Sequence, residues 1–315
     1  MPEHSLTGCI RNLRPTGSRL GAVTGALTST ICDLCEPTSV IACDPSAPFI
    51  EHARRKLSDA RVSFIVAGVE ALPRRDDGFH AVVSGLVLNF LPDPEAALAS
   101  VRDRLRSGGT VAAYVWDYAE GMEFLRSFWE EAAALDPRAT ALDEGRRFLL
   151  CRRPALTGLF RAVGLAQVET RPLEIPTDFA TFGDYWAPFL RGTGPAPSYV
   201  ASLDSPSREL LRERLRRRLH GGSDGRIQLR ARAWAVRGVS SFAALPPNKP
   251  MKPTRPRRPP RIGQLMGASA VTFRPLRTWE EVDSDASRPH WKGTLFFDGR
   301  LNKPVQPRLG SGRKR

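Results

Sequence analysis

The sequence lacks the long apolar run that a membrane-spanning helix needs. No stretch of about 18 consecutive apolar residues occurs in its 315 residues. The polar start at 1–18 also lacks the hydrophobic segment of a signal peptide. We therefore expect a cytoplasmic protein with no membrane partner. Its hydrophobic content of 41% suffices for a buried core.

Cysteine and histidine are scarce, with five residues of each. The one Cys-x-x-Cys pair, Cys32 and Cys35, has no second ligand pair nearby, so we expect reduced thiols and no metal. His52 and His80 have no partner at a catalytic spacing, and we assign them no role.

Basic residues are in excess, but they are unevenly distributed. The chain carries a net charge of +14. Residues 249–315 hold 16 Lys and Arg against 5 Asp and Glu, which leaves only +3 for the remainder. This tail begins with prolines at about every third residue between 246 and 260, too often for helix or sheet. We predict a largely disordered basic tail over 239–315 and expect deletion of residues 246–315 to change the melting temperature by only a few degrees.

Between residues 39 and 116 short apolar runs alternate with helical patterns. Such strands, covered on both faces by helices, predict an α/β fold with a doubly wound, mostly parallel sheet, whose ligands bind beyond the carboxyl ends of the strands. The predicted strands are 39–43, 62–66, 81–84, 109–116, 167–175 and 226–237, and the predicted helices are 26–34, 49–57, 94–106, 120–135 and 153–163. We expect Asp93 to cap helix 94–106 and Ser107, Gly108 and Gly109 to form the turn before the next strand.

Three elements along the chain have the order expected of a nucleoside-binding site. Gly21 and Gly25 enclose a turn before a helix, Asp44 ends a strand about 20 residues later, and the turn at 68–70 follows the next strand. A carboxylate at the position of Asp44 is suited to bind ribose hydroxyls, although an acid there also caps a following helix. Together the three elements favour a cofactor that contains adenosine.

The stretch "VEALPRRDDGFHAVVSGLVLNFLPDPEAALASVRDRLRSGGTVAAYVWDY" resembles bacterial S-adenosylmethionine-dependent methyltransferases of the type-11 group, related to the ubiquinone and menaquinone biosynthesis methyltransferases. The similarity extends to "RAWAVRG" at 232–238. It implies a Rossmann-like domain over 19–238, S-adenosylmethionine as the cofactor and a small-molecule methyl acceptor. The cofactor-binding residues that it implies are Gly21, Thr24, Gly25, Asp44, Val69, Glu70 and Ser84.

The N-terminus departs from the family pattern. Where the family has acid-x-Gly-x-Gly-x-Gly, this chain has Arg19, Gly21, Val23 and Gly25. The segment 1–18 is irregular and short, so the first strand is expected to be short or degenerate. Arg19 either meets the cationic methionine end of the cofactor or extends into solvent at little cost.

Two further segments leave alternatives open. Asp117 follows strand 109–116 at the expected substrate side, where it is a weak candidate for a general base and also suits a helix cap or a surface position. Trp116 beside it either faces the sulfonium or packs in the core. The aromatic-rich stretch 178–190, within a possible insert at 178–220, forms either a lid or part of a core.

The sequence supports a small-molecule methyltransferase as the leading hypothesis. The alternative is an inactive or truncated methyltransferase-fold remnant with a fused, disordered basic tail. A nucleic-acid partner is not expected, because the tail lacks interleaved stacking aromatics. The methyl acceptor and the oligomeric state stay open at this stage.

The departures predict that restoring the family's glycine turn strengthens cofactor binding. Two like charges about 5 Å apart repel by roughly 3 kcal/mol at an effective dielectric of about 20. Valine also resists the positive φ that glycine tolerates. The double substitution Arg19→Asp, Val23→Gly should raise the affinity for S-adenosylmethionine by about ten- to a thousandfold. Calorimetric titration of both proteins at equal ionic strength measures the change, and equal affinities would contradict a damaged turn.

Overall fold

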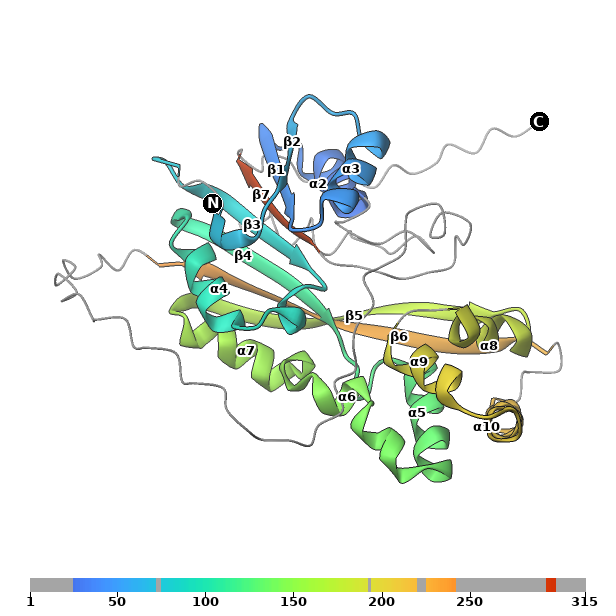
Figure 1. Ribbon diagram of the computed structural model, residues 1–315. Helices are drawn as coiled ribbons and strands as arrows, with labels where there is room; N and C mark the ends of the chain where they lie inside the picture. Colours follow the sequence, from blue (N-terminus) through green and yellow to red (C-terminus); the bar gives the residue numbers. More distant parts are fainter. Residues whose placement is uncertain (1–24, 72–74, 192–193, 220–224, 242–292, 299–315) are drawn as a thin grey trace, which may run out of the picture. The chain divides into compact units, whose positions relative to one another are not determined.

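The computed structural model describes residues 25–71, 75–191, 194–219, 225–241 and 293–298. These residues form a seven-stranded sheet with helices packed against it (Figure 1). The strands are β1 (Ser39–Asp44), β2 (Val62–Val66), β3 (Phe79–Gly85), β4 (Leu105–Trp116), β5 (Leu165–Phe179), β6 (Ile227–Ser240) and β7 (Gly293–Asp298). Their spatial order is β2-β1-β7-β3-β4-β6-β5.

The α/β class is confirmed, and the sheet is mixed rather than mostly parallel. β1 pairs with β2, and β3 with β4, in parallel. β7 is antiparallel to β1 and β3, and β6 is antiparallel to β4 and β5. The first strand expected near residue 19 lies outside the described residues. Periodicity identifies strands but not their direction, which explains why the antiparallel pairs were missed.

The helices follow the predicted order. They are α2 (Ala26–Cys35), α3 (Ala47–Lys56), α4 (Pro94–Arg102), α5 (Glu123–Leu135), α6 (Glu144–Arg147), α7 (Arg153–Ala162), α8 (Phe182–Arg191), α9 (Pro195–Ser202) and α10 (Ser205–Arg218). Single 3-10 turns are η1 (Val69–Ala71), η2 (Leu88–Phe90), η3 (Pro137–Ala141) and η4 (Leu149–Cys151). None of these helices is both long and apolar enough to cross a bilayer.

The two ends of helix α4 illustrate where local prediction works. Asp93 caps the helix as predicted, since its carboxylate accepts a hydrogen bond from the Ala96 amide at 2.9 Å. The predicted end is wrong, because the helix stops at Arg102 and β4 begins at Leu105. The glycines form an irregularity in the pairing of β3 and β4, with Gly108 at φ 73.

Two apolar clusters pack against the sheet, and successive residues of β3 belong alternately to one cluster and to the other. Val82 packs in a cluster that contains side chains of α4 and α7. Ala81 and Val83 pack in another that contains side chains of α2 and β1. Because successive side chains of a strand point to opposite faces, helices cover both faces of the sheet.

Beyond β4, the long strands β5 and β6 carry a separate layer made of α5, α8, α9 and α10 (Figure 1). The aromatic residues of 178–190 pack within it. Phe189 stacks on Phe124 and Phe128 with ring centroids 4.6 and 4.4 Å apart, and the Tyr185 hydroxyl donates to the Phe124 carbonyl at 3.0 Å. This packing supports a core rather than a lid for the stretch. The proposed domain boundaries stay predictions.

The expectation of reduced thiols needs a correction. Among the described cysteines, Cys32, Cys43 and Cys151 are buried thiols outside any disulfide bond, whereas Cys35 is disulfide-bonded. Burial is the main cause that raises the pKa of the Cys32 thiol to about 11. The spacing of Cys32 and Cys35 gave no sign that only one of them is a free thiol.

Strand β7 lies within the segment expected to be disordered. Its backbone pairs with β1 from Ser39 to Cys43 and with β3 from Ala81 to Gly85. It is therefore a central strand, and β1 and β3 are joined only through it in the described sheet. The tail was predicted to contribute little to stability, and this pairing predicts the opposite.

We expect a proline in β7 to destabilise the fold. Phe296 lies opposite Ile41 on one side and Val82 on the other. Phe296→Pro removes one backbone donor and clashes within the ladder, at a cost of roughly 3 kcal/mol. The melting temperature should fall by about 6–12 °C for a domain of this size. Ser269→Pro, in the undescribed segment 242–292, is the control. Equally small effects of both changes would show that β7 does not hold the sheet together.

Candidate functional site

Four strands end at one edge of the sheet. β1 is parallel to β2, β3 is parallel to β4, and β7 is antiparallel to both β1 and β3. β1 and β3 therefore run in the same direction, and the carboxyl ends of β1 to β4 share an edge. Ligands of open α/β sheets bind beyond such an edge. We describe this edge as the candidate site.

Asp44 and the segment after β2 meet at this edge. Asp44 is buried, with 5% of its surface exposed, and its Oδ1 accepts from the Ser46 amide at 2.8 Å. Its carbonyl oxygen accepts from the Ala67 amide at 3.0 Å, which fixes the end of β1 beside the start of the 67–69 loop. Val69 follows in η1 and is buried with Cys43 in one apolar cluster. The strand end that carries Asp44 and the loop that leads to Val69 therefore start side by side.

Of the predicted glycine turn, only Gly25 lies among the described residues. Gly25 has φ 80, a conformation that favours glycine, and it precedes α2. A Cβ built on Gly25 would lie 3.7 Å from the Cβ of Leu57 and 3.8 Å from the Ala53 carbonyl. These residues belong to the far end of α3, about 10–15 Å along that helix from its start next to Asp44. Gly21, Thr24, Arg19 and Val23 lie outside the described residues, as does the side chain of Glu70.

The end of β3 is tightly packed against β4. Ser84 is buried, and a Cβ on the next residue, Gly85, would lie 2.5 Å from the Tyr114 hydroxyl. Leu86 then has φ 57, unusual for a branched side chain, and its amide donates to the Tyr114 carbonyl at 2.8 Å. Burial raises the pKa of Tyr114 to about 12. Strained backbone of this kind gathers at functional sites.

Asp117 is held by an ion pair just beyond β4. It is 2% exposed, and its Oδ2 lies 2.6 Å from Nη2 and 2.8 Å from Nε of Arg232 on β6. Its Oδ1 accepts from the Glu120 amide at 3.2 Å. Both carboxylate oxygens therefore have partners, which supports the structural interpretation of Asp117 over the general base. Arg232 also stacks over Trp234, with its guanidinium carbon 4.9 Å from the ring centroid.

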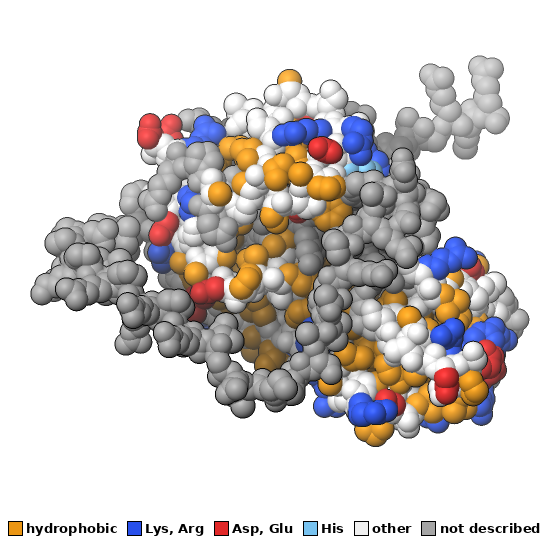
Figure 2. Space-filling view, viewed as in Figure 1, with side chains coloured by type: hydrophobic (Ala, Val, Ile, Leu, Met, Phe, Trp, Pro, Cys, Tyr) orange, Lys and Arg blue, Asp and Glu red, His pale blue; other side chains and the backbone are white. Residues whose placement is uncertain are grey.

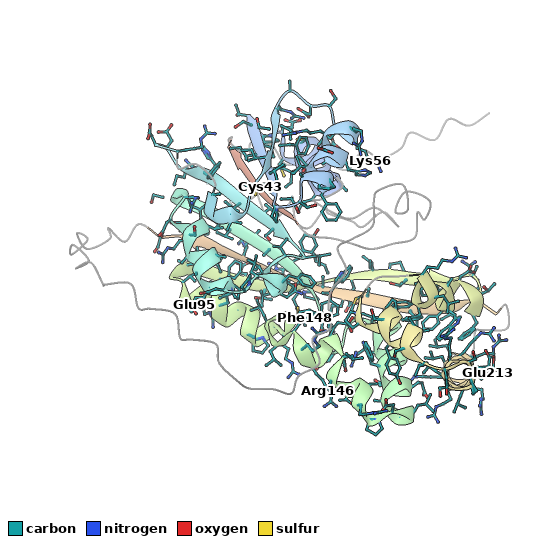
Figure 3. All side chains as sticks on the ribbon, viewed as in Figure 1. Cys43, Lys56, Glu95, Arg146, Phe148 and Glu213 are labelled. Atoms are coloured by element: carbon teal, nitrogen blue, oxygen red, sulfur yellow. The ribbon has the colours of Figure 1, made fainter. Side chains whose placement is uncertain are left out.

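An aromatic patch at the same edge consists of Phe90, Tyr118 and Phe148, of which the sequence indicated only Tyr118, at the substrate side of strand 109–116. The ring of Phe148 lies 5.2 Å from that of Phe90 and 5.4 Å from that of Tyr118. Figure 3 labels Phe148 near the end of β4. Phe90 follows the end of the predicted strand 81–84, and this position is a signal that could have found it. Phe148 has no such signal, because only the packing of η2 against η4 brings it there.

The titratable groups next to this patch include three that are largely buried, Tyr118, Cys151 and Glu144. Burial raises the pKa of Tyr118 above its usual range, and Cys151 and Glu144 raise it further. Burial likewise raises the pKa of Cys151 to about 12, with Asp117 as a second cause. Glu144 is buried and accepts from the Trp129 indole at 2.5 Å. Burial thus favours the neutral forms of Tyr118 and Cys151, and Glu144 is paired with the Trp129 indole.

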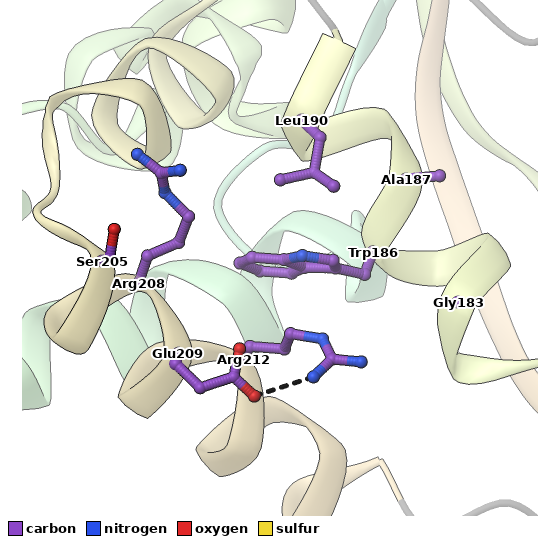
Figure 4. Close-up of a pocket in the computed structure, with 8 residues that line it drawn as sticks. All are labelled: Gly183, Trp186, Ala187, Leu190, Ser205, Arg208, Glu209 and Arg212. Carbon is purple, nitrogen blue, oxygen red and sulfur yellow. Dashed lines mark hydrogen bonds and ion pairs between the residues drawn. The ribbon is translucent and has the colours of Figure 1, made fainter.

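A separate hollow opens on the helical layer, between α8 and α10 (Figure 4). Its charged groups already have partners. Arg212 lies 2.8 Å from Glu209, and Arg208 donates to the carbonyls of Val200 and Leu203. Figure 2 shows acidic and basic side chains intermingled over this layer. We assign no ligand to this hollow.

Residues 19–113 match the model of a protein family described as a methyltransferase domain. The match supports methyl transfer as the activity and S-adenosylmethionine as the cofactor. A comparison with the sequences of curated proteins finds no match.

The chain is also similar, at low sequence identity, to several solved structures that are described as methyltransferases or as candidates for that activity. A candidate type II methyltransferase from Anaeromyxobacter dehalogenans has 16% identity and a TM-score of 0.49, over 70% of this chain and 88% of its own. A candidate methyltransferase from an antibiotic biosynthesis pathway of Anabaena variabilis has 19% identity and a TM-score of 0.46, over 74% and 97%. Haemonchus contortus phosphoethanolamine N-methyltransferase 2, in complex with S-adenosyl-L-methionine, has 13% identity and a TM-score of 0.42, over 75% and 52%.

The ion pair of Asp117 with Arg232 yields a prediction about stability. Arg232→Met keeps the aliphatic stem but leaves a buried carboxylate without its partner, which should cost about 3–5 kcal/mol. Asp117→Asn still accepts from the Glu120 amide, so adding it to Arg232→Met should recover most of that loss. Chemical denaturation of the wild type, both single variants and the double variant measures the coupling. A double variant no more stable than Arg232→Met would refute the role given to this pair.

Proposed function

We propose that this chain, whose residues 19–113 match a methyltransferase domain, transfers a methyl group from S-adenosylmethionine to a small molecule at the carboxyl edge of β3 and β4. The observation that carries the proposal is the contact between the end of β1 and the loop after β2. It puts the end of β1, with the buried acid Asp44, beside the loop that leads to the buried apolar residue Val69. Ribose hydroxyls and an adenine ring require this combination.

The described residues fit the adenosine half of the cofactor. Asp44 would accept hydrogen bonds from the ribose hydroxyls, Val69 would cover one side of the adenine, and the packed end of β3 at Ser84 would border the site. The methionine half of the cofactor would be bound by residues 19–24, which lie outside the described residues. When bound, the cofactor supplies a methyl group that is already activated by its sulfonium. The protein's task is then to orient the acceptor and exclude water.

A general base is needed only where the acceptor atom loses a proton during attack. Asp117, the candidate from the sequence, is engaged by Arg232 and by the Glu120 amide. We therefore propose a positioning role for it, in which it fixes the start of the segment after β4. A cytoplasmic location stays a prediction of the sequence.

A second candidate is a methyltransferase-fold remnant without activity. The placement of Gly25 against the far end of α3 favours it, because that glycine then lies away from Asp44. The antiparallel direction of β7 favours it too, since a strand of this direction starts, rather than ends, at the cofactor edge. The two candidates differ in whether the chain binds the cofactor at all.

The proposal predicts that Asp44→Asn weakens cofactor binding. The amide oxygen of asparagine still accepts from the Ser46 amide, but its nitrogen cannot accept from a ribose hydroxyl. Hydrogen bonds to a charged acceptor contribute roughly 1.5–3 kcal/mol, so S-adenosylhomocysteine should bind at least tenfold more weakly. Calorimetric titration of the full chain measures this.

Asp33→Asn is the matched control for that titration. Asp33 is an exposed acid on α2 that accepts from the Ser29 hydroxyl at 3.2 Å, and its neutralisation should leave binding unchanged. Unchanged affinity in Asp44→Asn would remove Asp44 from the site. No binding by the wild type would favour the remnant.

A further inference from the structure

A groove between helix α7 and strand β5 has a strongly basic lining. α7 packs along β5, which is the last strand of the described sheet and is separated from β4 by β6 (Figure 1). The volume of the groove is about 290 Å³. Its polar lining consists of Arg153, Thr157, Arg161, Glu169, Thr170 and Arg171. The groove therefore lies outside the candidate site and presents three arginines.

A pair of threonines fixes the helix against the strand inside this groove. Oγ1 of Thr157 lies 2.8 Å from Oγ1 of Thr170, and the Thr157 hydroxyl donates to the Arg153 carbonyl at 2.7 Å. Because a hydroxyl has one proton, Thr170 is then the donor to Thr157. Both protons are used within the protein, which leaves the binding of a ligand to the arginines.

Two arginines of α7 have no acidic partner. Arg153, Thr157 and Arg161 are four residues apart and share one side of the helix, which puts the two arginines about 12 Å apart along its axis. Both arginines are exposed, and within the described ranges neither guanidinium forms an ion pair. The guanidinium carbon of Arg153 lies 5.8 Å from the ring centroid of Trp234, a stacked arrangement that leaves its N–H edges open.

The charge of Arg153 is unfavourable for the helix that carries it. α7 begins at Arg153, its first turn contains no acidic residue, and the side chain of Arg152 does not cap it. The start of a helix has a partial positive charge, which repels a cation there. An anion next to Arg153 would offset this repulsion.

The acid in the lining does not neutralise the groove. Glu169 is already bound by Arg237, whose Nη2 lies 3.1 Å from Oε1 and whose Nε lies 3.2 Å from Oε2. Arg171 lies 3.6 Å from the same carboxylate. With Arg153 and Arg161, four arginines thus accompany one carboxylate, and the excess of positive charge favours an anionic ligand.

We infer that this groove binds a small molecule through a phosphate monoester group, held by Arg153 and Arg161. A phosphate monoester has three terminal oxygens and a charge of about −1.5 to −2 at neutral pH, so it satisfies several guanidinium groups at once. A carboxylate offers two oxygens and a single charge. The volume of the groove is at the lower end for small-molecule sites, which limits the organic part to a few atoms. This inference does not depend on the proposed function.

The probe is glycerol 3-phosphate, compared with glycerate, a carboxylate of similar size. Calorimetric titrations use the full chain at equal ionic strength. We expect glycerol 3-phosphate to bind at least about tenfold more tightly than glycerate. Arg153→Gln and Arg161→Gln should each weaken its binding about five- to tenfold, because each removes a charged donor. Equal affinities for the two probes would overturn the assignment of a phosphate.

Arg55→Gln is the matched control. Arg55, like Arg161, is exposed in the last turn of a helix of 10 residues, so loss of either charge should affect stability equally. Arg153→Gln should keep or raise the melting temperature, since it removes a cation from the start of α7. A probe affinity that neither groove variant lowers, or that Arg55→Gln lowers as much, would assign binding to other basic residues and overturn the groove.

Protection from phenylglyoxal, which modifies exposed guanidinium groups, locates the probe directly. Saturating glycerol 3-phosphate should slow the modification of Arg153 and Arg161 and leave that of Arg55 unchanged, as read by mass spectrometry of peptides. Equal protection of all three arginines, or none, contradicts the site.

Phosphatidic acid carries the same phosphate monoester on a membrane surface. Sedimentation with phosphatidylcholine vesicles that contain phosphatidic acid, lost in Arg161→Gln and found without binding of glycerol 3-phosphate, would replace the soluble ligand by a lipid headgroup.

Discussion

The sheet depends on one central strand. β1 and β2 form one parallel pair and β3 and β4 another, and the described backbone connects the two pairs through β7. A sheet interrupted between β1 and β3 would expose unpaired amides and carbonyls in its middle, which a folded protein does not tolerate. The same pairing aligns the carboxyl ends of β1 to β4. The candidate site therefore owes its geometry to a segment far away in the sequence.

Within that frame, the two sides of the edge have different chemistry. The side of β1 and β2 combines a buried acid with a backbone link between neighbouring strand ends, Asp44 to Ala67. The side of β3 and β4 is apolar, and its one buried carboxylate beyond β4, Asp117, is neutralised by Arg232.

Local signals predicted much of the fold. The strands at 39–43 and 62–66 and the capping of α4 by Asp93 are in place, because hydrophobic periodicity and cap chemistry act over a few residues. The end of α4 was misplaced, since the glycines after it serve the pairing of β3 with β4 rather than a turn. The contribution of 293–298 was missed because six residues in a proline-rich, basic segment carry no sign of their partners.

The candidate site, like the fold, has features that the sequence predicted and features that only the tertiary structure decided. By itself the sequence determined the α/β class and the acid at the end of β1. It also determined the family match over 19–113, because each of these is encoded in contiguous residues. Tertiary structure alone decided that Gly25 lies against the end of α3 and that Asp117 pairs with Arg232. It alone brought Phe148 to Phe90 and Tyr118. These contacts join residues tens to more than a hundred positions apart, and their energies depend on burial and charge pairing, which exist only once the chain has folded.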